Sequence, residues 1–233
     1  NTLVDAASGS QKGALYVKGH PEFSGKGTLI VNGNVKHAIK SGEYMTVKDA
    51  TIKVQSAAGD GINCGQYFLM ESGVLNISGV EDDGIQCDID DTDTGSTGET
   101  ADHEDEDSGN IYLEGGQITI NTAGIAAKGV KSEGDLIVKG GVIDITTTGN
   151  GKWDEEDVKT KAAACLGSDA KVVISGGTLT LTSTGAGGKG INCDAAFELS
   201  GGEVTIVTQG ALYYHNGTTE NTNYTGNTDN VNS

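Results

Sequence analysis

The sequence predicts an all-β fold: a single-domain, right-handed parallel β-helix, or solenoid, of about seven to eight coils over residues 1–215. The first observation is a repeated phrase, because Asp60-Gly61-Ile62-Asn63-Cys64 returns in modified form at residues 83–87 and 189–193. The second is that each copy precedes two short runs of alternating apolar and polar residues, separated by a glycine-rich turn. The third is composition, since 37 glycines and one proline suit short strands joined by tight turns. The right hand follows from the usual preference of parallel crossovers.

One apolar position of the phrase aligns the coils and is expected to be buried. Its occupants are Ile39, Ile62, Ile85, Val130, Leu166, Ile191 and Leu212. Successive steps are 23, 23, 45, 36, 25 and 21 residues, so the two longest steps contain insertions, at about residues 88–108 and 149–161. Residues 13–34 are expected to form a less regular first coil that covers one end of the stack. Residues 216–233, rich in Asn, Thr and Gly, are expected to be a tail or linker.

Alternation in the two later runs of each coil predicts which side chains fill the interior. In the first run the expected inward pairs are Phe68/Met70, Ile111/Leu113, Leu136/Val138, Val172/Ile174 and Phe197/Leu199. In the second run they are Ile52/Val54, Leu75/Ile77, Ile118/Ile120, Ile143/Ile145, Leu179/Leu181 and Val204/Ile206. Cys64, Cys87 and Cys193 share one position of the repeat, so we expect buried free thiols, although the spacing of neighbouring coils alone permits a disulfide.

Some outward positions of the first run are apolar, which is unusual for a solvated face. They are Ile30, Leu69, Tyr112, Ile137 and Val173. One interpretation is that an insertion folds over this face. The other is a surface for self-association or for a ligand, because contiguous exposed apolar patches are uncommon on monomeric proteins.

The charge of the chain restricts its partners. The formal net charge is −18, and the 15 basic residues are all lysine. A nucleic-acid partner is excluded, because phosphate neutralisation requires a basic surface. Membrane insertion is also not expected, because no stretch is long and apolar enough to span a bilayer. The chain begins without a charged-then-apolar leader, so we expect that a signal peptide of a secreted protein has been removed or left out.

Aspartates of the repeated phrase are the candidate metal ligands. Asp60 and Asp83 occupy the same slot on adjacent coils, and Asp82 and Asp88 flank it. Stacked like charges require a cation, a shared proton or lysine partners. Calcium suits such a ladder, because it takes six to eight oxygen ligands with tolerant geometry, and Asp90 or the next aspartate would complete the shell. The alternative is ordinary turn chemistry, in which the carboxylates accept hydrogen bonds from backbone amides.

The two insertions carry further candidates. The first contains ten acidic residues between Asp88 and Asp107, with His103 among them, and its composition predicts a solvated, mobile loop. The second contains the single tryptophan, Trp153, which is either an anchor that packs the loop on the coils or a platform for a sugar ring. The four histidines show no paired spacing for zinc, and no nucleophile motif is present.

Two phrases of the chain resemble a known bacterial family. They are residues 82–88 (DDGIQCD) and residues 129–141 (GVKSEGDLIVKGG). Both are similar to phrases of carbohydrate-binding domain-containing proteins, over roughly residues 35–210. The resemblance implies a right-handed parallel β-helix similar in shape to pectate lyases, binding of cellulose and acidic sugars, and bound calcium held by Asp82, Asp83 and Asp88. The chain departs from the family at Gln86, where a histidine is common, and in the acidic insertion.

These observations lead to three hypotheses. The first is a secreted or cell-surface bacterial protein that binds calcium and a cell-wall or acidic, uronate-containing polysaccharide without catalysis, through Trp153, Lys128 and Lys131. The second is a calcium-dependent polysaccharide lyase similar to pectate lyases, with Lys131 or Lys128 as the base. The absence of arginine disfavours it. The third is a structural or adhesive surface solenoid.

Overall fold

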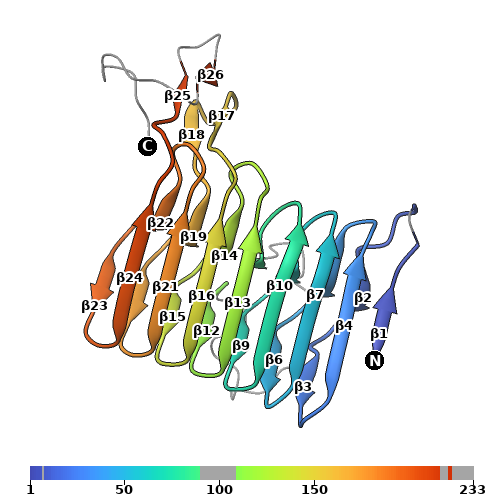
Figure 1. The fold of residues 1–233 in the computed structure, drawn as a ribbon. Helices are drawn as coiled ribbons and strands as arrows, with labels where there is room; N and C mark the ends of the chain where they lie inside the picture. The colour runs from blue at the N-terminus through green and yellow to red at the C-terminus, as the bar shows by residue number, and fades with distance from the viewer. Residues whose placement is uncertain (7, 90–108, 216–219, 222–233) are drawn as a thin grey trace.

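Three parallel sheets form the faces of a solenoid, and the N-terminal strand β1 and the last coil strand β24 lie at its opposite ends (Figure 1). The computed structural model describes residues 1–6, 8–89, 109–215 and 220–221. We name the three sheets A, B and C; each coil passes in order through B, C and A, and each coil strand pairs in parallel with its equivalents on the neighbouring coils. Sheets B and C have seven strands each, so the described chain makes seven three-stranded coils. The parallel solenoid is confirmed; its right hand stays a prediction.

The strands are short, as the alternating runs predicted. Sheet A contains β1 (Thr2–Val4), β4 (Thr28–Gly33), β7 (Thr51–Ala57), β10 (Val74–Val80), β13 (Gln117–Thr122), β16 (Val142–Thr147), β21 (Thr178–Ser183) and β24 (Glu203–Thr208). Sheet B contains β2 (Gly13–Val17), β5 (His37–Ser41), β8 (Ile62–Cys64), β11 (Ile85–Cys87), β14 (Lys128–Ser132), β19 (Ala164–Ser168) and β22 (Lys189–Cys193). Sheet C contains β3 (Glu22–Ser24), β6 (Met45–Lys48), β9 (Phe68–Met70), β12 (Ile111–Leu113), β15 (Leu136–Val138), β20 (Val172–Ile174) and β23 (Phe197–Leu199).

The predicted alignment of the coils is confirmed residue by residue on sheet B. Ile39, Ile62, Ile85, Val130, Leu166 and Ile191 pair in one continuous row along the stack. Leu212 does not continue the row: it lies outside any strand and is 41% exposed. That prediction was wrong because the chain leaves the solenoid after β24 instead of starting another described coil.

Apolar side chains from all three sheets fill the interior. The predicted inward pairs are buried through β20 and β21. Phe197, Leu199 and Ile206 are instead about half exposed (48%, 54% and 48%), because they belong to the last described coil and no further coil covers them. At the other end, Leu15, Phe23 and Leu29 of the first coil pack against the core. All four cysteines are free thiols. Cys64 and Cys87 lie at equivalent positions of the adjacent strands β8 and β11.

The outward apolar row exists on sheet C with one correction. Leu69, Tyr112, Ile137 and Val173 pair in sequence from β9 to β20, and each is partly exposed. Ile30 does not belong to this row, because residues 28–33 form β4 of sheet A and Ile30 pairs with Lys53. Self-association through the row stays a prediction.

The insertions leave the solenoid at different corners. The first lies between β11 and β12, and its residues 90–108, with Asp90 and His103, lie outside the described residues. The second lies between β16 and β19 and contains an antiparallel hairpin, β17 (Lys152–Asp154) and β18 (Lys159–Lys161). A smaller pair, β25 (Tyr214–His215) and β26 (Glu220–Asn221), follows the last coil next to this hairpin (Figure 1). No membrane-spanning helix occurs in the described part of the chain.

Candidate functional site

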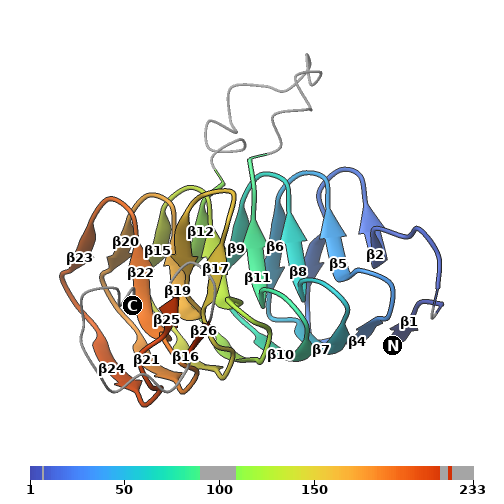
Figure 2. The same cartoon turned by 90° about the horizontal axis from the view of Figure 1, so that it is seen from above.

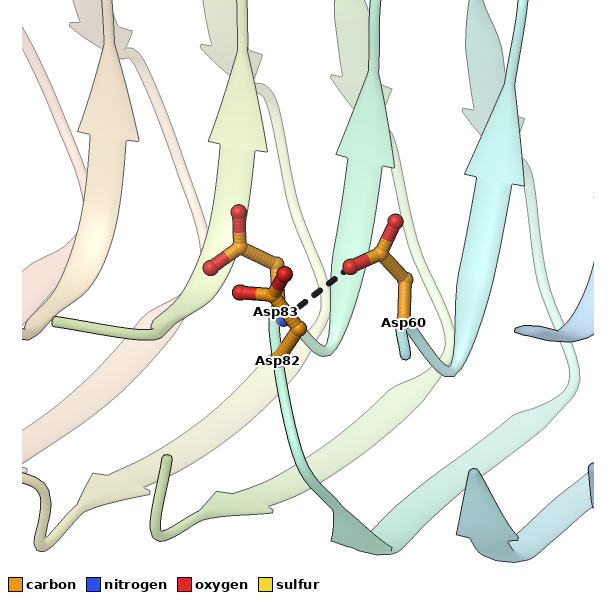
Figure 3. Close-up of side chains that lie close together, drawn as sticks. All are labelled: Asp60, Asp82 and Asp83. Atoms are coloured by element: carbon orange, nitrogen blue, oxygen red, sulfur yellow. Dashed lines mark hydrogen bonds between the residues drawn. The ribbon is translucent and has the colours of Figure 1, made fainter. Parts of the chain in front are cut away.

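A ladder of polar residues runs along the corner where the chain enters sheet B. His37, Asp60, Asp83 and Lys128 occupy equivalent positions on four successive coils, as the register of the neighbouring isoleucines and Val130 requires. The Asp83 N–H donates to Asp60 Oδ1 (3.1 Å), and the Lys128 N–H donates to Asp83 Oδ1 (2.5 Å). Both aspartates therefore accept a hydrogen bond from the backbone of the next coil, which is the arrangement expected from turn chemistry. Figure 3 shows the bond between Asp83 and Asp60.

The ladder still holds excess negative charge. Asp60, Asp82 and Asp83 each present a carboxylate oxygen, and these oxygens lie within 4.8 Å of one another (Figure 3). Asp60 and Asp83 are buried, whereas Asp82 is exposed. Asp88 is outside this group and is joined to it by Asn63, whose Nδ2 donates to Asp60 Oδ2 (2.7 Å) and Asp88 Oδ2 (3.3 Å).

Burial perturbs the ionisation of this cluster. It raises the pKa of Asp83 to about 7, and the Asp60 and Asp82 carboxylates add to that effect against the backbone and charge of Lys128. The pKa of Asp82 is also raised, although its side chain is exposed, first by partial loss of water around the carboxylate and then by the charge of Asp60. Ionisation of both Asp82 and Asp83 is therefore unfavourable unless a cation is present. The donor set, three carboxylates with hard oxygen atoms, fits a calcium ion.

A polar groove of about 550 Å³ lies one to three coils further along the stack. Its floor is formed by residues of β14, β19 and β22, and its wall by Asp157 and residues 159–162 of the hairpin insertion, which include β18. Figure 2 shows β19 and β22 next to each other in sheet B. Five lysines line it: Lys128, Lys131, Lys159, Lys161 and Lys189. Asp157, Asp169 and Asp194 also line it. One third of the basic residues of a strongly acidic chain are thus gathered at one groove.

The groove lysines differ in their partners. Lys131 forms an ion pair with Asp169, and Lys161 binds Asp154 (2.5 Å) and Asp157 (3.3 Å) within the hairpin. By contrast, Lys128 Nζ donates to the Ala126 carbonyl (2.8 Å), and Lys189 Nζ donates to Asn192 Oδ1 (3.4 Å). Within the described residues, neither Lys128 nor Lys189 forms an ion pair with a carboxylate. Burial also lowers the pKa of Lys128 from its usual value.

The predicted sugar-binding residues separate into two places. Lys128 and Lys131 lie in the groove. Trp153 lies on the hairpin with its ring stacked on His215, as expected for the anchor interpretation. Sequence reasoning missed Lys159, Lys161 and Lys189. Lys189 carries a usable signal, because it takes the position of Lys128 in the repeated phrase. Lys159 and Lys161 carry no such signal, because the residues of an insertion have no equivalents in the other coils.

The fold and the groove define the class of protein: a repeat protein whose stacked coils carry a polar groove on one face. A family described as carbohydrate-binding domain-containing protein matches residues 1–211, and the chain belongs to that family. No curated protein and no solved structure matched the chain.

Proposed function

We propose that this protein is a non-catalytic binding protein for an acidic polysaccharide, held in the lysine-lined groove. The observation that carries the proposal is the concentration of five lysines at one groove of a chain with a net charge of −18. Lys128 and Lys189 are the key residues, because their ammonium groups have no carboxylate partner among the described residues. Family membership supports a carbohydrate as the ligand. Because such polymers occur in cell walls, a secreted or cell-surface bacterial protein fits this role.

The spacing of the two lysines suits a repeating anionic ligand. Lys128, Ala164 and Lys189 are equivalent residues on three successive strands. Strands in a sheet are about 4.8 Å apart, so the two lysines are separated along the stack by roughly twice that distance. An extended chain of uronate residues lying along the stack could therefore place one carboxylate at each lysine. A neutral glycan would leave both ammonium groups without a counter-charge in the groove.

Replacing Lys189 with alanine is expected to weaken binding of a uronate oligosaccharide about tenfold or more, the usual effect of losing a hydrogen bond to a charged group. Isothermal titration calorimetry with oligogalacturonate measures this change. Alanine is tolerated at this position of the repeat, since Ala164 occupies it one coil earlier. Added salt should weaken wild-type binding by screening the charges.

Lys139→Ala is the matched control, because it removes the same charge from a surface ion pair with Glu114, away from the groove. It should bind as the wild type does. Equal affinities of wild type and Lys189→Ala would show that the ligand does not bind in the groove. Equally tight binding of neutral cello-oligosaccharides would show that carboxylates are not recognised.

Calcium at the aspartate cluster is the second part of the proposal. Asp60, Asp82 and Asp83 would supply its protein ligands, and the ion would offset charges that burial leaves unfavourable. At about 100-fold excess over its Kd, calcium should stabilise the protein by roughly 2.7 kcal/mol. Thermal melting of wild type and of Asp82→Asn, with calcium or with chelator, measures this. Because Asp82 is exposed, its replacement should leave the fold intact and remove most of the gain.

Glu198→Gln, which removes an exposed acid of the last coil, should retain the full calcium response. If calcium leaves the melting temperature of the wild type unchanged, the aspartates hold no calcium and only accept hydrogen bonds from backbone amides. Magnesium should stabilise less, because its strict octahedral geometry suits a cluster on a rigid corner poorly.

A lyase is the second candidate function, and one observation favours it. The lowered pKa of Lys128 increases the fraction of neutral amine, the form that could remove the proton next to a uronate carboxyl. Lys131 is less suited to this role, because it is paired with Asp169. Formation of an unsaturated product from oligogalacturonate, lost in Lys128→Ala, would establish the lyase and contradict non-catalytic binding.

A further inference from the structure

The hairpin that forms the groove wall is attached to the solenoid by an aromatic contact. The rings of Trp153 and His215 are stacked, with centroids 4.6 Å apart and planes 10° from parallel. The ion pairs of Lys159 and Lys161 join residues of the same insertion, namely Asp154 and Asp157. Such pairs shape the hairpin but do not fix it to the coils. The stack on His215 instead joins the hairpin to the segment that follows the last coil.

Tyr213 secures the same segment to the base of the hairpin. It is the largest fully buried side chain of the described residues, with 0% exposure. It lies against two glycines: a Cβ on Gly151 would be 3.4 Å from its Cγ, and a Cβ on Gly187 would be 2.6 Å from its Cβ. The backbone continues the contact, because the Gly187 N–H donates to the Ala211 carbonyl (2.8 Å) and the Gly151 N–H to the Ala186 carbonyl (2.8 Å).

These contacts join residues inside the family match to residues that follow it. The family match ends at residue 211, and both Tyr213 and His215 follow it. The hairpin they hold contributes Lys159 and Lys161 to the groove, whereas the floor lysines belong to the regular coils. Through the stack on Trp153, the residues after the last coil therefore act on the wall of the groove.

We propose that Tyr213 and His215 are positioning residues: together they form a C-terminal anchor that holds hairpin β17–β18 over sheet B and so sets the width of the groove. The effect of the anchor on ligand binding rests on the proposed function, whereas the anchor itself rests only on the contacts described above. One face of the Trp153 ring is covered by His215, so Trp153 serves the groove by holding its wall. Loss of the stack would release the hairpin and move Lys159 and Lys161 away from a ligand on the floor.

Substitution of His215 tests the anchor, and the chain provides its own probe in the single tryptophan. In His215→Ala, Trp153 emission should shift to the red as its ring meets water, and backbone amides of residues 152–161 should exchange hydrogen faster. Affinity for oligogalacturonate should fall about threefold to tenfold, the usual effect of losing one aromatic pair. In His215→Phe a flat ring can stack again, so emission, exchange and affinity should return toward the wild-type values.

His20→Ala is the matched control, because His20 also stacks on an aromatic ring, Tyr44, but in the first coil. It should leave Trp153 emission and hairpin exchange unchanged. Unchanged emission and exchange in His215→Ala would overturn the anchor. Faster exchange with unchanged affinity would overturn its control of the groove. If the wild type itself binds no acidic oligosaccharide, the proposed function fails, and emission and exchange still decide whether the anchor exists.

Discussion

In metal-free buffer, Asp83→Asn is expected to be more stable than the wild type at pH 8 by a margin on the order of a few kcal/mol, and the two proteins should converge near pH 4. The folded-state pKa of Asp83 is raised from 3.8 to about 7, so the folded protein binds an extra proton between these values. The contribution of protonated Asp83 to the free energy of unfolding is therefore fully present below about pH 3.8 and is lost as the pH rises to about 7. Asparagine stays neutral, and its Oδ1 can still accept the Lys128 N–H.

Chemical denaturation of both proteins at several pH values measures this difference. The comparison is needed because general repulsion among 33 acidic residues also lowers stability as the pH rises. Glu198→Gln removes one exposed charge and should show a pH profile close to that of the wild type. Parallel profiles for wild type and Asp83→Asn would show that the Asp83 carboxylate ionises as an ordinary surface group. Calcium should restore wild-type stability at pH 8 and have little effect on Asp83→Asn.

Gly129→Val is expected to destabilise the fold by about 3 kcal/mol, at the upper end of the usual overpacking range. A Cβ at Gly129 would lie 2.2 Å from Ile145 Cγ2 and 2.7 Å from the Cys165 carbonyl oxygen. The backbone of sheet B therefore lies directly against a core side chain of sheet A. Gly61, Gly84 and Gly190 meet isoleucines of sheet A in the same way, which explains the glycine of the repeated phrase.

Thermal and chemical denaturation of Gly129→Val measure the loss. Gly27→Val is the control, because no atom lies within 4 Å of a Cβ at Gly27, and its stability should stay within about 0.5 kcal/mol of the wild type. A similar small effect for Gly129→Val would mean that sheets A and B are less closely packed than these distances indicate. The same position accepts a side chain in the next coil, where Cys165 is buried.

Local sequence was sufficient to predict the coils, because each one repeats the same alternation and the same close approach of strands. Ile62, Ile85 and Val130 could be aligned from the repeated phrase alone, since stacking places equivalent residues in register. The same rule placed Asp60 beside Asp83. It failed for Ile30 and Leu212, which lie where the repeat is irregular or has ended. The predictions on Asp90 and the acidic insertion lie outside the described residues.

By itself, the sequence determined the parallel solenoid, its buried rows and the aspartate cluster, because these features depend only on period and register. The tertiary structure alone decided where the groove lies. Its wall comes from an insertion and its anchor from the residues after the last coil, and neither obeys the repeat. Their positions follow from packing between segments about 60 residues apart, such as Trp153 and His215, which no local pattern encodes.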